Sequence, residues 1–304
     1  MTSTTEPGRP DAVDVSVLVA VAPPHYARLP TQLRCLLDQH TSRRVEILVA
    51  DNGGHLDQVD LVGIGVEGEV LVVDASARRG AAFARNRAAD VARGDALLFC
   101  DADDVVGPGW IDAHADALAG SDLTVGPTIP LPATGAEVDA SIVDWASDRF
   151  RDRPIRHEGI DVGDSANLGV RRSVFVGVGG FPEAYLRSQD VALTLRLRHE
   201  GVTPTFVPGA RVAVAVADRR SVDELRVRFH AGRARVMIAR DFAVPARPWI
   251  LAPRAAARAL RAPFRGVARR GRRRSITGEV AELGGIVREL VAAHPGRDDD
   301  RAMA

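Results

Sequence analysis

Short apolar runs alternate with amphipathic stretches along the first half of the chain. The runs predict strands at Val13–Ala22, Val45–Ala50, Glu69–Val73, Ala96–Cys100 and Leu123–Val125. Between them, apolar spacing near the helical period predicts helices at Leu29–Gln39 and Ala81–Arg93. Strands that alternate with helices predict an α/β fold with a doubly wound, mostly parallel sheet.

The second half of the chain is less regular. The pattern predicts a loop at Pro127–Ala136, helices at Ser141–Phe150 and Gln189–His199, and a long helix at Val222–Arg240. It also predicts strands at Ala166–Val170, Phe206–Val207 and Val212–Ala217.

Three carboxylates follow the most apolar of these strands. The run Ala96–Cys100 ends in Asp101, Asp103 and Asp104. Asp101 and Asp103 are two residues apart, so at a strand end they point to the same side. A divalent cation relieves their repulsion, because hard cations take oxygen ligands. The alternative is an acidic turn ahead of a helix that starts near Trp110.

Length and composition limit the class of protein. With 304 residues and 46% apolar residues, the chain can form one α/β domain with an appendage. No apolar run approaches the length of a membrane span. The first 12 residues lack a basic start and an apolar core, so we expect a disordered lead-in and no signal peptide. Cys35 and Cys100 fall in predicted elements, which favours a reduced, cytoplasmic protein.

A net charge of zero conceals a split between body and C-terminal segment. Phe242–Gly278 holds ten arginines and no acid, which leaves 30 basic and 40 acidic residues elsewhere. Within Arg254–Arg274, six arginines share one helical face, and apolar residues lie roughly opposite: Leu260, Phe264 and Val267. The pattern predicts contact with an anionic membrane surface; the alternative is a solvated helix. Few aromatic residues accompany the arginines, so nucleic acid is not expected.

Several motifs occur in a consistent order. Asp51-Asn52-Gly53 follows a strand, Arg79-Gly80 and Ala84-Arg85-Asn86 open a helix, and Phe99–Asp104 ends a strand. Further along lie Asn167–Arg172, Val178–Glu183 and Gln189-Asp190-Val191. In this order the motifs resemble a family 2 glycosyltransferase of the GT-A fold, over Val13–Arg240.

The resemblance implies a GT-A-like domain at residues 13–240 and a basic helical C-terminal extension at 241–304. A nucleotide-sugar half would span residues 13–127 and an acceptor half 128–240. It implies a hexosyltransferase-type enzyme that moves a sugar from a nucleoside diphosphate sugar to an acceptor hydroxyl in one inverting displacement. The acceptor is a glycan, a lipid-linked molecule or a small molecule of cell-envelope or glycan biosynthesis. We expect the enzyme in the cytoplasm, at the inner face of the membrane.

The resemblance also implies roles for particular residues. Asp190 is the expected general base, and Asp103, with Asp101, the expected ligand of Mn²⁺ or Mg²⁺. The expected donor-binding residues are Asp51, Arg79, Arg85, Asn86 and Asp101. The expected acceptor-side residues are Gly180, Phe181, Trp145 and Gln189.

Each role has a simpler alternative in the residues themselves. Asp51 can accept from a base edge or only from its own turn. The Arg85 fork suits a diphosphate, but an arginine-rich surface helix also explains it. Asp190 in a first helical turn also suits the helix dipole. Trp145 is a candidate sugar platform or a core residue.

Three departures from the family leave other functions open. Gln189 stands where the family usually has Glu. No His follows the strand at Val212–Ala217, where the family often has a metal ligand; Asp218 is a candidate substitute. The first strand runs into Pro23-Pro24-His25 instead of the usual turn.

One alternative is a non-catalytic relative that binds a sugar nucleotide or a glycan. The other is a nucleotidyltransferase, which would need a Gly-rich basic loop early in the chain. Val19–Arg28 contains one arginine and no glycine.

Overall fold

The computed structural model describes residues 12–23, 25–56, 70–131, 140–157, 159–215, 221–242 and 276–292. Contacts divide the chain into two compact units. The first comprises Met1–Ala184 and Gln189–Ala217; the second comprises Tyr185–Ser188 and Asp218–Ala304.

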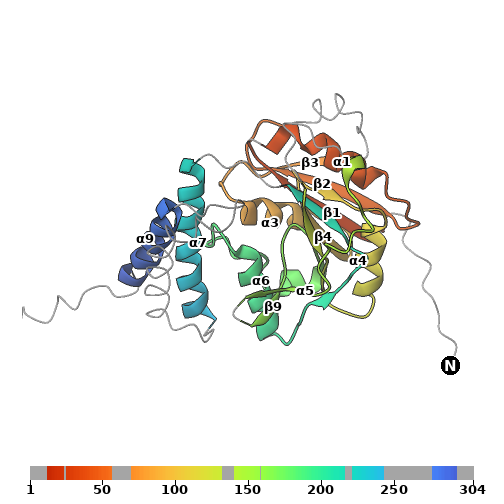
Figure 1. Ribbon diagram of the computed structural model, residues 1–304. Helices are drawn as coiled ribbons and strands as arrows, with labels where there is room; N and C mark the ends of the chain where they lie inside the picture. Colours follow the sequence, from red (N-terminus) through yellow and green to blue (C-terminus); the bar gives the residue numbers. More distant parts are fainter. Residues whose placement is uncertain are drawn as a thin grey trace, which may run out of the picture. The chain divides into compact units, whose positions relative to one another are not determined.

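A seven-stranded sheet forms the centre of the first unit (Figure 1). Its order is β11-β6-β10-β4-β1-β2-β3, and only β10 runs antiparallel to its neighbours. The strands are β1 Val15–Val21, β2 Val45–Asp51, β3 Val70–Asp74, β4 Ala96–Asp101, β6 Leu123–Val125, β10 Leu168–Arg171 and β11 Thr205–Phe206. The predicted α/β class with a mostly parallel sheet is confirmed.

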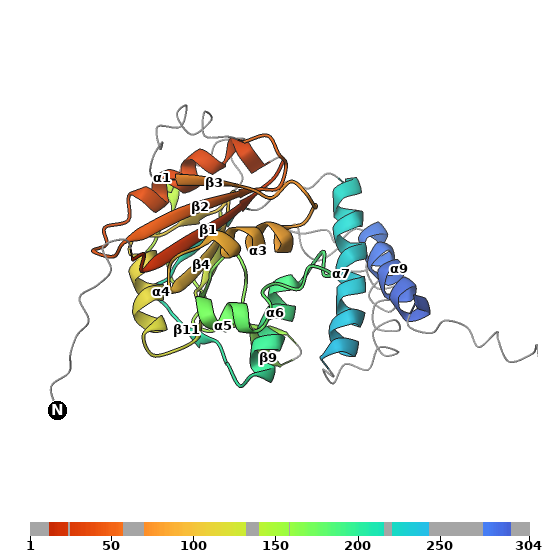
Figure 2. The same cartoon turned by 180° about the vertical axis from the view of Figure 1, so that it is seen from behind.

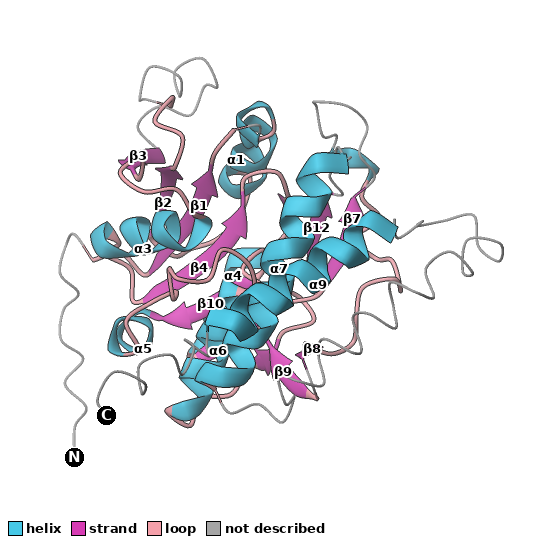
Figure 3. Ribbon diagram, turned by 90° about the vertical axis from the view of Figure 1, so that its left-hand side faces the viewer, coloured by secondary structure: helices cyan, strands magenta, loops and turns pink. Residues whose placement is uncertain are grey.

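Helices cover both faces of this sheet (Figures 2 and 3). Side chains of α1 Leu29–Leu37 and α4 Trp110–Leu118 share a core with Val17 and Val19 of β1. Leu18 points the other way and packs with the second set of helices. These are α3 Ala81–Val91, α5 Arg172–Gly177 and α6 Gln189–His199. Strands buried on both faces explain the uninterrupted apolar runs.

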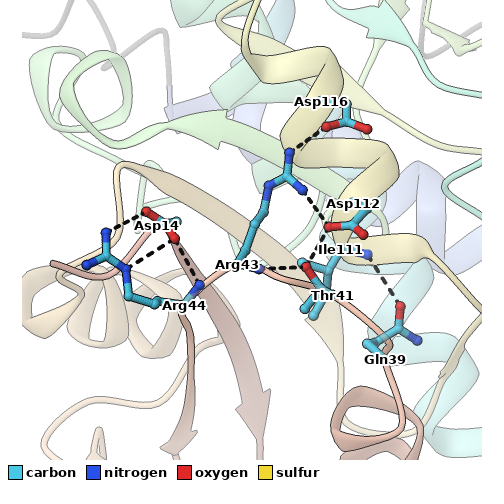
Figure 4. Close-up of polar contacts among 8 residues, drawn as sticks. All are labelled: Asp14, Gln39, Thr41, Arg43, Arg44, Ile111, Asp112 and Asp116. Carbon is cyan, nitrogen blue, oxygen red and sulfur yellow. Dashed lines mark hydrogen bonds and ion pairs between the residues drawn. The ribbon is translucent and has the colours of Figure 1, made fainter. Parts of the chain in front are cut away.

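Ion pairs hold the loops where β1 and β2 begin (Figure 4). Arg44, next to β2, pairs with Asp14, next to β1, at 3.1 Å. Arg43 pairs with Asp112 at 2.6 Å and with Asp116 at 2.5 Å, both on α4. These ion pairs lie at the amino ends of β1 and β2, and the carboxyl ends of β1 and β4 lie on the opposite side of the sheet.

Two smaller pieces flank the main sheet. A three-stranded sheet joins β5 Val105–Val106, β12 Val212–Ala215 and β7 Thr128–Leu131, and a hairpin joins β8 Ile155–His157 and β9 Ile160–Val162. The predicted loop at Pro127–Ala136 is therefore wrong at β7. Pro130 was the reason for predicting a loop. Among the described strands β7 lies at the edge of its sheet, beside β12, where proline is tolerated.

The predicted helix at Ser141–Phe150 is also wrong. Only the 3₁₀ turn η2 Ala140–Ile142 forms, followed by turns. Asp144 accepts the backbone N–H of Ala146 at 3.1 Å, and Ser147 accepts that of Arg149 at 3.3 Å. Such local side-chain bonds compete with the helical ladder.

In the second unit, the described residues include a helix pair. α7 Ser221–Asp241 packs against α9 Ile276–Ala292 (Figure 3). A Cβ on Gly232 of α7 would strike the carbonyl oxygen of Glu282, and one on Gly285 of α9 would strike that of Phe229. Arg233 pairs with Glu289 across the helices at 3.0 Å. The sequence prediction placed α7 in the GT-A-like domain at residues 13–240, whereas its contacts group it with α9.

Other parts of the sequence prediction lie outside the described residues. They include Arg254–Arg274 with its arginine face, Asp218, and all but the last residue of the lead-in. Across the described ranges, no helix has the length and hydropathy needed to cross a bilayer.

Candidate active site

The site lies where the strand order changes direction. β2 lies on one side of β1 and β4 on the other, and Ala20 near the end of β1 pairs with Asp101 at the end of β4. Crevices at the carboxyl ends of such strands are the usual ligand sites of α/β sheets. β10 runs the opposite way and pairs its first residue, Leu168, with Phe99. The turn before β10 therefore lies at the same edge as Asp101.

Arg85 and Asp101 form an ion pair at this edge. The Arg85 side chain comes from α3 and is only 3% exposed, while 35% of Asp101 is exposed. The guanidinium also lies 5.5 Å from the ring centre of Phe181. A buried cation thus stands behind an accessible carboxylate, which brings together two residues that the sequence assigned to the donor.

The side chains of Asp103 and Asp104 contact different partners. The Oδ2 atom of Asp103 lies 3.0 Å from Nδ1 of His25, in the turn after β1. Asp104 is buried and accepts the backbone N–H of Ala215 at 2.9 Å, which ties it to the end of β12. Among the described residues its other oxygen has no hydrogen-bond partner. Burial, followed by the charges of Asp101 and Asp103, raises the pKa of Asp104 well above its ordinary value.

The Asp51 carboxylate is hydrogen-bonded by neighbouring protein groups. It is 2% exposed and accepts the hydroxyl of Tyr26 and the backbone N–H groups of Gly53 at 2.9 Å, His55 at 2.7 Å and Leu56 at 2.7 Å. Burial by itself would raise the pKa of Asp51, but these hydrogen bonds outweigh it and hold the pKa below its ordinary value. The carboxylate thus orders the turn after β2, and contact with a donor stays a prediction.

The loop before α3 is held from the same turn. Asn52 donates to the carbonyl oxygens of Ala75 at 2.5 Å and Arg78 at 2.7 Å, and accepts the N–H of Gly80 at 2.7 Å. Arg79, the predicted donor residue, is exposed beside Gly80. No role was predicted for Asn52; the available signal was its place directly after Asp51.

Asn86 contacts the turn at Gly180 and Phe181, the residues predicted for the acceptor side. Its amide donates to the carbonyl of Phe181 at 2.9 Å and to Glu183 at 2.9 Å, and it accepts the N–H of Phe181 at 2.9 Å. Gly180 has φ +67°, and a Cβ there would lie 2.7 Å from Oδ1 of Asn86. The structure therefore connects Asn86, Gly180 and Phe181, and it places Asn86 as a residue that positions the turn.

Asp190 lies in the first turn of α6, beside a second acid. Its carboxylate is half-buried and accepts the N–H of Val191 at 2.8 Å and that of Ser165 at 3.4 Å. Burial raises the pKa of Asp190. Burial, followed by the charge of Asp190, raises the pKa of Asp164 to about 6. Asp101 and Arg85 contribute to both pKa shifts. Ser165 lies in the turn before β10, so the two acids lie on the same side of the sheet as the end of β4.

Gln189 and Trp145 complete the predicted set. Gln189 opens α6 and is half-buried. Trp145 packs with the core of the three-stranded sheet: its ring stacks on Phe150 with centres 6.1 Å apart, and it lies against Gly107. These contacts explain Trp145 as a packing residue, and a sugar platform on its other face stays a prediction.

The donors at this site fit a divalent ion that a substrate helps to hold. Across the described ranges, no group of three or more His, Cys, Asp or Glu side chains could hold an ion by itself. Mg²⁺ in phosphate-transfer sites uses one or two carboxylates and takes further ligands from phosphates. Asp103 with His25, and Asp101 close by, form such a partial set.

Comparison with known proteins gives the class of the chain. Residues 23–177 match the profile of Glycosyl transferase family 2, so the chain belongs to this family of enzymes. No curated protein sequence matches significantly. Two similar solved structures have the same GT-A fold.

One similar structure is the mannosyltransferase PcManGT from Pyrobaculum calidifontis in complex with GDP-Man and Mn²⁺. The TM-score is 0.60 at 18% identity, over 92% of this chain and 87% of that chain. Another is GalNAc-T7 with UDP, GalNAc and Mn²⁺. Here the TM-score is 0.52 at 15% identity, over 68% of this chain and 45% of that chain.

Proposed function

We propose that this glycosyltransferase moves a sugar from a nucleoside diphosphate sugar to an acceptor hydroxyl in a single inverting displacement. The observation that supports it best is the Arg85–Asp101 ion pair at the carboxyl end of β4, on the same side of the sheet as the turn before β10 whose Ser165 N–H donates to Asp190. The similar structures hold GDP-Man and UDP, which supports a nucleoside diphosphate as the donor's leaving group.

On the donor side, Arg85 and Asp103 are the central residues. The Arg85 guanidinium is a fork suited to a diphosphate; since it is 3% exposed and paired with Asp101, a diphosphate would reach it beside the Asp101 carboxylate. Asp103 would hold Mn²⁺ or Mg²⁺, which when bound offsets the charge on the leaving nucleoside diphosphate. Asp51 and Arg79 are proposed to flank the nucleoside and phosphates.

On the acceptor side, Asp190 takes the proton of the attacking hydroxyl. The hydroxyl O–H bond breaks as the new bond to the anomeric carbon forms and the bond to the diphosphate breaks. A raised pKa makes Asp190 a stronger base than an ordinary carboxylate. Gly180, Phe181, Gln189 and Trp145 are proposed to shape this side.

Hydrolysis of a panel of nucleotide sugars tests the proposal. We expect wild-type enzyme to release nucleoside diphosphate from one donor in the presence of Mn²⁺ and much less after chelation. Asp103→Asn should lose the Mn²⁺-stimulated hydrolysis. Asp38→Asn, an exposed substitution beyond α1, should keep it. Tight donor binding without release of nucleoside diphosphate would instead favour a non-catalytic relative, which Gln189 in place of Glu would suit.

We also propose that the arginine face of Arg254–Arg274 brings the enzyme to the anionic inner face of the membrane. The support is the sequence pattern, six arginines with Leu260, Phe264 and Val267 opposite. A lipid-linked acceptor of cell-envelope or glycan biosynthesis would be met there.

A further inference from the structure

A histidine lies against the carboxylate expected to hold the metal. His25 begins the one-turn helix η1 His25–Ala27, just after β1, and Asp103 follows β4. Since β1 and β4 are neighbours, their carboxyl ends bring the two residues together. Nδ1 of His25 lies 3.0 Å from Oδ2 of Asp103, and their side chains are 39% and 18% exposed.

The position of His25 is fixed by its own turn. Its N–H donates to the carbonyl of Ala22 at 2.8 Å, and its carbonyl accepts the N–H of Arg28 at 3.0 Å. The next residue, Tyr26, donates its hydroxyl to the buried Asp51. His25 is therefore presented to Asp103 by a turn anchored at the end of β2.

The spacing of the two side chains suits a shared metal ion. Two adjacent ligands of an octahedral ion with bonds of about 2.1 Å lie roughly 3.0 Å apart. The same spacing accommodates a proton on the line between the nitrogen and the oxygen. An ion bonded to both atoms lies off that line, so it can take the place of the proton once the imidazole ring turns toward it. Neutral imidazole nitrogen is a common ligand of transition metals.

Other described histidines are placed differently. His114 is fully buried, with its two ring nitrogens 2.9 Å from Thr124 and from Asn167. The described part of the strand near Asp104, Val212–Ala215, carries no histidine. An imidazole thus approaches Asp103 from the end of β1, whereas the family often has a histidine in the region after this strand.

We propose that His25 supplies a nitrogen ligand, through Nδ1, to the divalent ion held by Asp103, and that it makes the site prefer Mn²⁺ to Mg²⁺. The inference rests on the proposed metal-dependent binding of the donor. Diphosphate oxygens and water would complete the shell. The preference follows because Mg²⁺ takes oxygen ligands, whereas first-row transition ions accept imidazole.

Electron paramagnetic resonance of Mn²⁺ bound together with UDP or GDP tests this directly. Electron spin echo modulation from a ¹⁴N nucleus is expected in the wild type and absent in His25→Gln. The Mn²⁺ dissociation constant should rise at least ~10-fold in His25→Gln. The matched control is His40→Gln, an exposed histidine beyond α1, which should leave both readings unchanged.

A second variant guards against loss of fold. His25→Asp keeps a ligand at this position, so Mn²⁺ should still bind, the ¹⁴N modulation should vanish, and the preference for Mn²⁺ over Mg²⁺ should shrink. Bound Mn²⁺ without ¹⁴N modulation in the wild type, or modulation that persists in His25→Gln, would overturn the role of His25 alone. If the wild type with UDP or GDP binds no Mn²⁺, the proposed metal-dependent donor binding fails, and this inference fails with it.

Discussion

Asp190 accepts the backbone N–H of Ser165 at 3.4 Å, so the first turn of α6 is tied to the turn that carries Asp164. The two carboxyl groups come from segments about 25 residues apart in the chain, yet their charges interact. Both also interact with Arg85 and Asp101. The proposed base and the proposed donor site at the end of β4 therefore share one electrostatic environment.

Replacing the proposed base tests its role. Asp190→Asn keeps the shape of the side chain and removes the proton acceptor, so turnover should fall by ~10²–10⁴-fold while donor affinity changes little. Transfer rates and calorimetry of nucleoside diphosphate binding measure the two effects. The control is Asp90→Asn on the exposed side of α3. Near-normal transfer by Asp190→Asn would assign the proton to another group, with Asp164 and Glu183 the first to test.

The pKa of Asp164 has a consequence for stability. A carboxyl whose pKa rises from 3.8 to about 6 on folding binds protons more readily in the native state. Stability should therefore fall as the pH rises through this window and level off above it. Asp164→Asn removes this loss. The melting temperature of the variant, relative to that of the wild type, should therefore rise as the pH increases from 4 to about 7.

Thermal unfolding of both proteins from pH 4 to 8 checks this expectation. Asp104 and Asp190 also have raised pKa values. The charge of Asp164 helps to raise the pKa of Asp104, so Asp164→Asn should reduce the loss at Asp104 as well, in the same direction. A melting-temperature difference that does not vary with pH would contradict the assignment.

We expect substitution of Asn86 to affect the turn at Gly180 and Phe181 more than donor binding. Asn86→Ala leaves the N–H and carbonyl of the buried Phe181 without their hydrogen bonds, which costs about 1–3 kcal/mol of unfolding free energy. The KM for acceptor should rise while donor binding changes little. Arg87→Ala, the next residue of α3, removes only a surface ion pair and should cost little. Loss of donor binding in Asn86→Ala would restore the role that the sequence predicted.

Burial and local hydrogen bonds explain which parts of the fold could be predicted from the sequence. Buried runs such as Ala96–Cys100 mark strands because both faces of the sheet are covered. The failure at Ser141–Phe150 arose because apolar spacing does not register turn bonds such as the one from Asp144.

The candidate site was predictable only in part. A carboxylate after a strand, such as Asp101 or Asp51, could be found from its place in the chain. The contact of His25 with Asp103 depends on which strands are neighbours, and that of Asn86 with Phe181 joins segments 95 residues apart. Local sequence patterns do not contain such pairings.

Membrane contact by the arginine face can be tested by flotation. Each arginine near an anionic surface contributes about 1 kcal/mol before screening, so binding should weaken as salt rises. Because α9 packs on α7, substitution is a cleaner test than truncation. The full chain should float with vesicles that contain anionic lipid at low salt. A variant with six arginines changed to glutamine should not: Arg254, Arg258, Arg261, Arg265, Arg269 and Arg272. Equal flotation of both proteins, or flotation of neither, would contradict membrane contact by the arginine face and favour the solvated-helix alternative.

The stereochemistry of the product tests the single inverting displacement most directly. The donor found in the nucleotide-sugar panel is hydrolysed by wild-type enzyme, Mn²⁺ is removed with a chelator, and proton NMR spectra are recorded before the free sugar equilibrates. From an α-linked donor, attack opposite the leaving diphosphate gives the β anomer first. Early appearance of the α anomer would contradict a single displacement with Asp190 as the base.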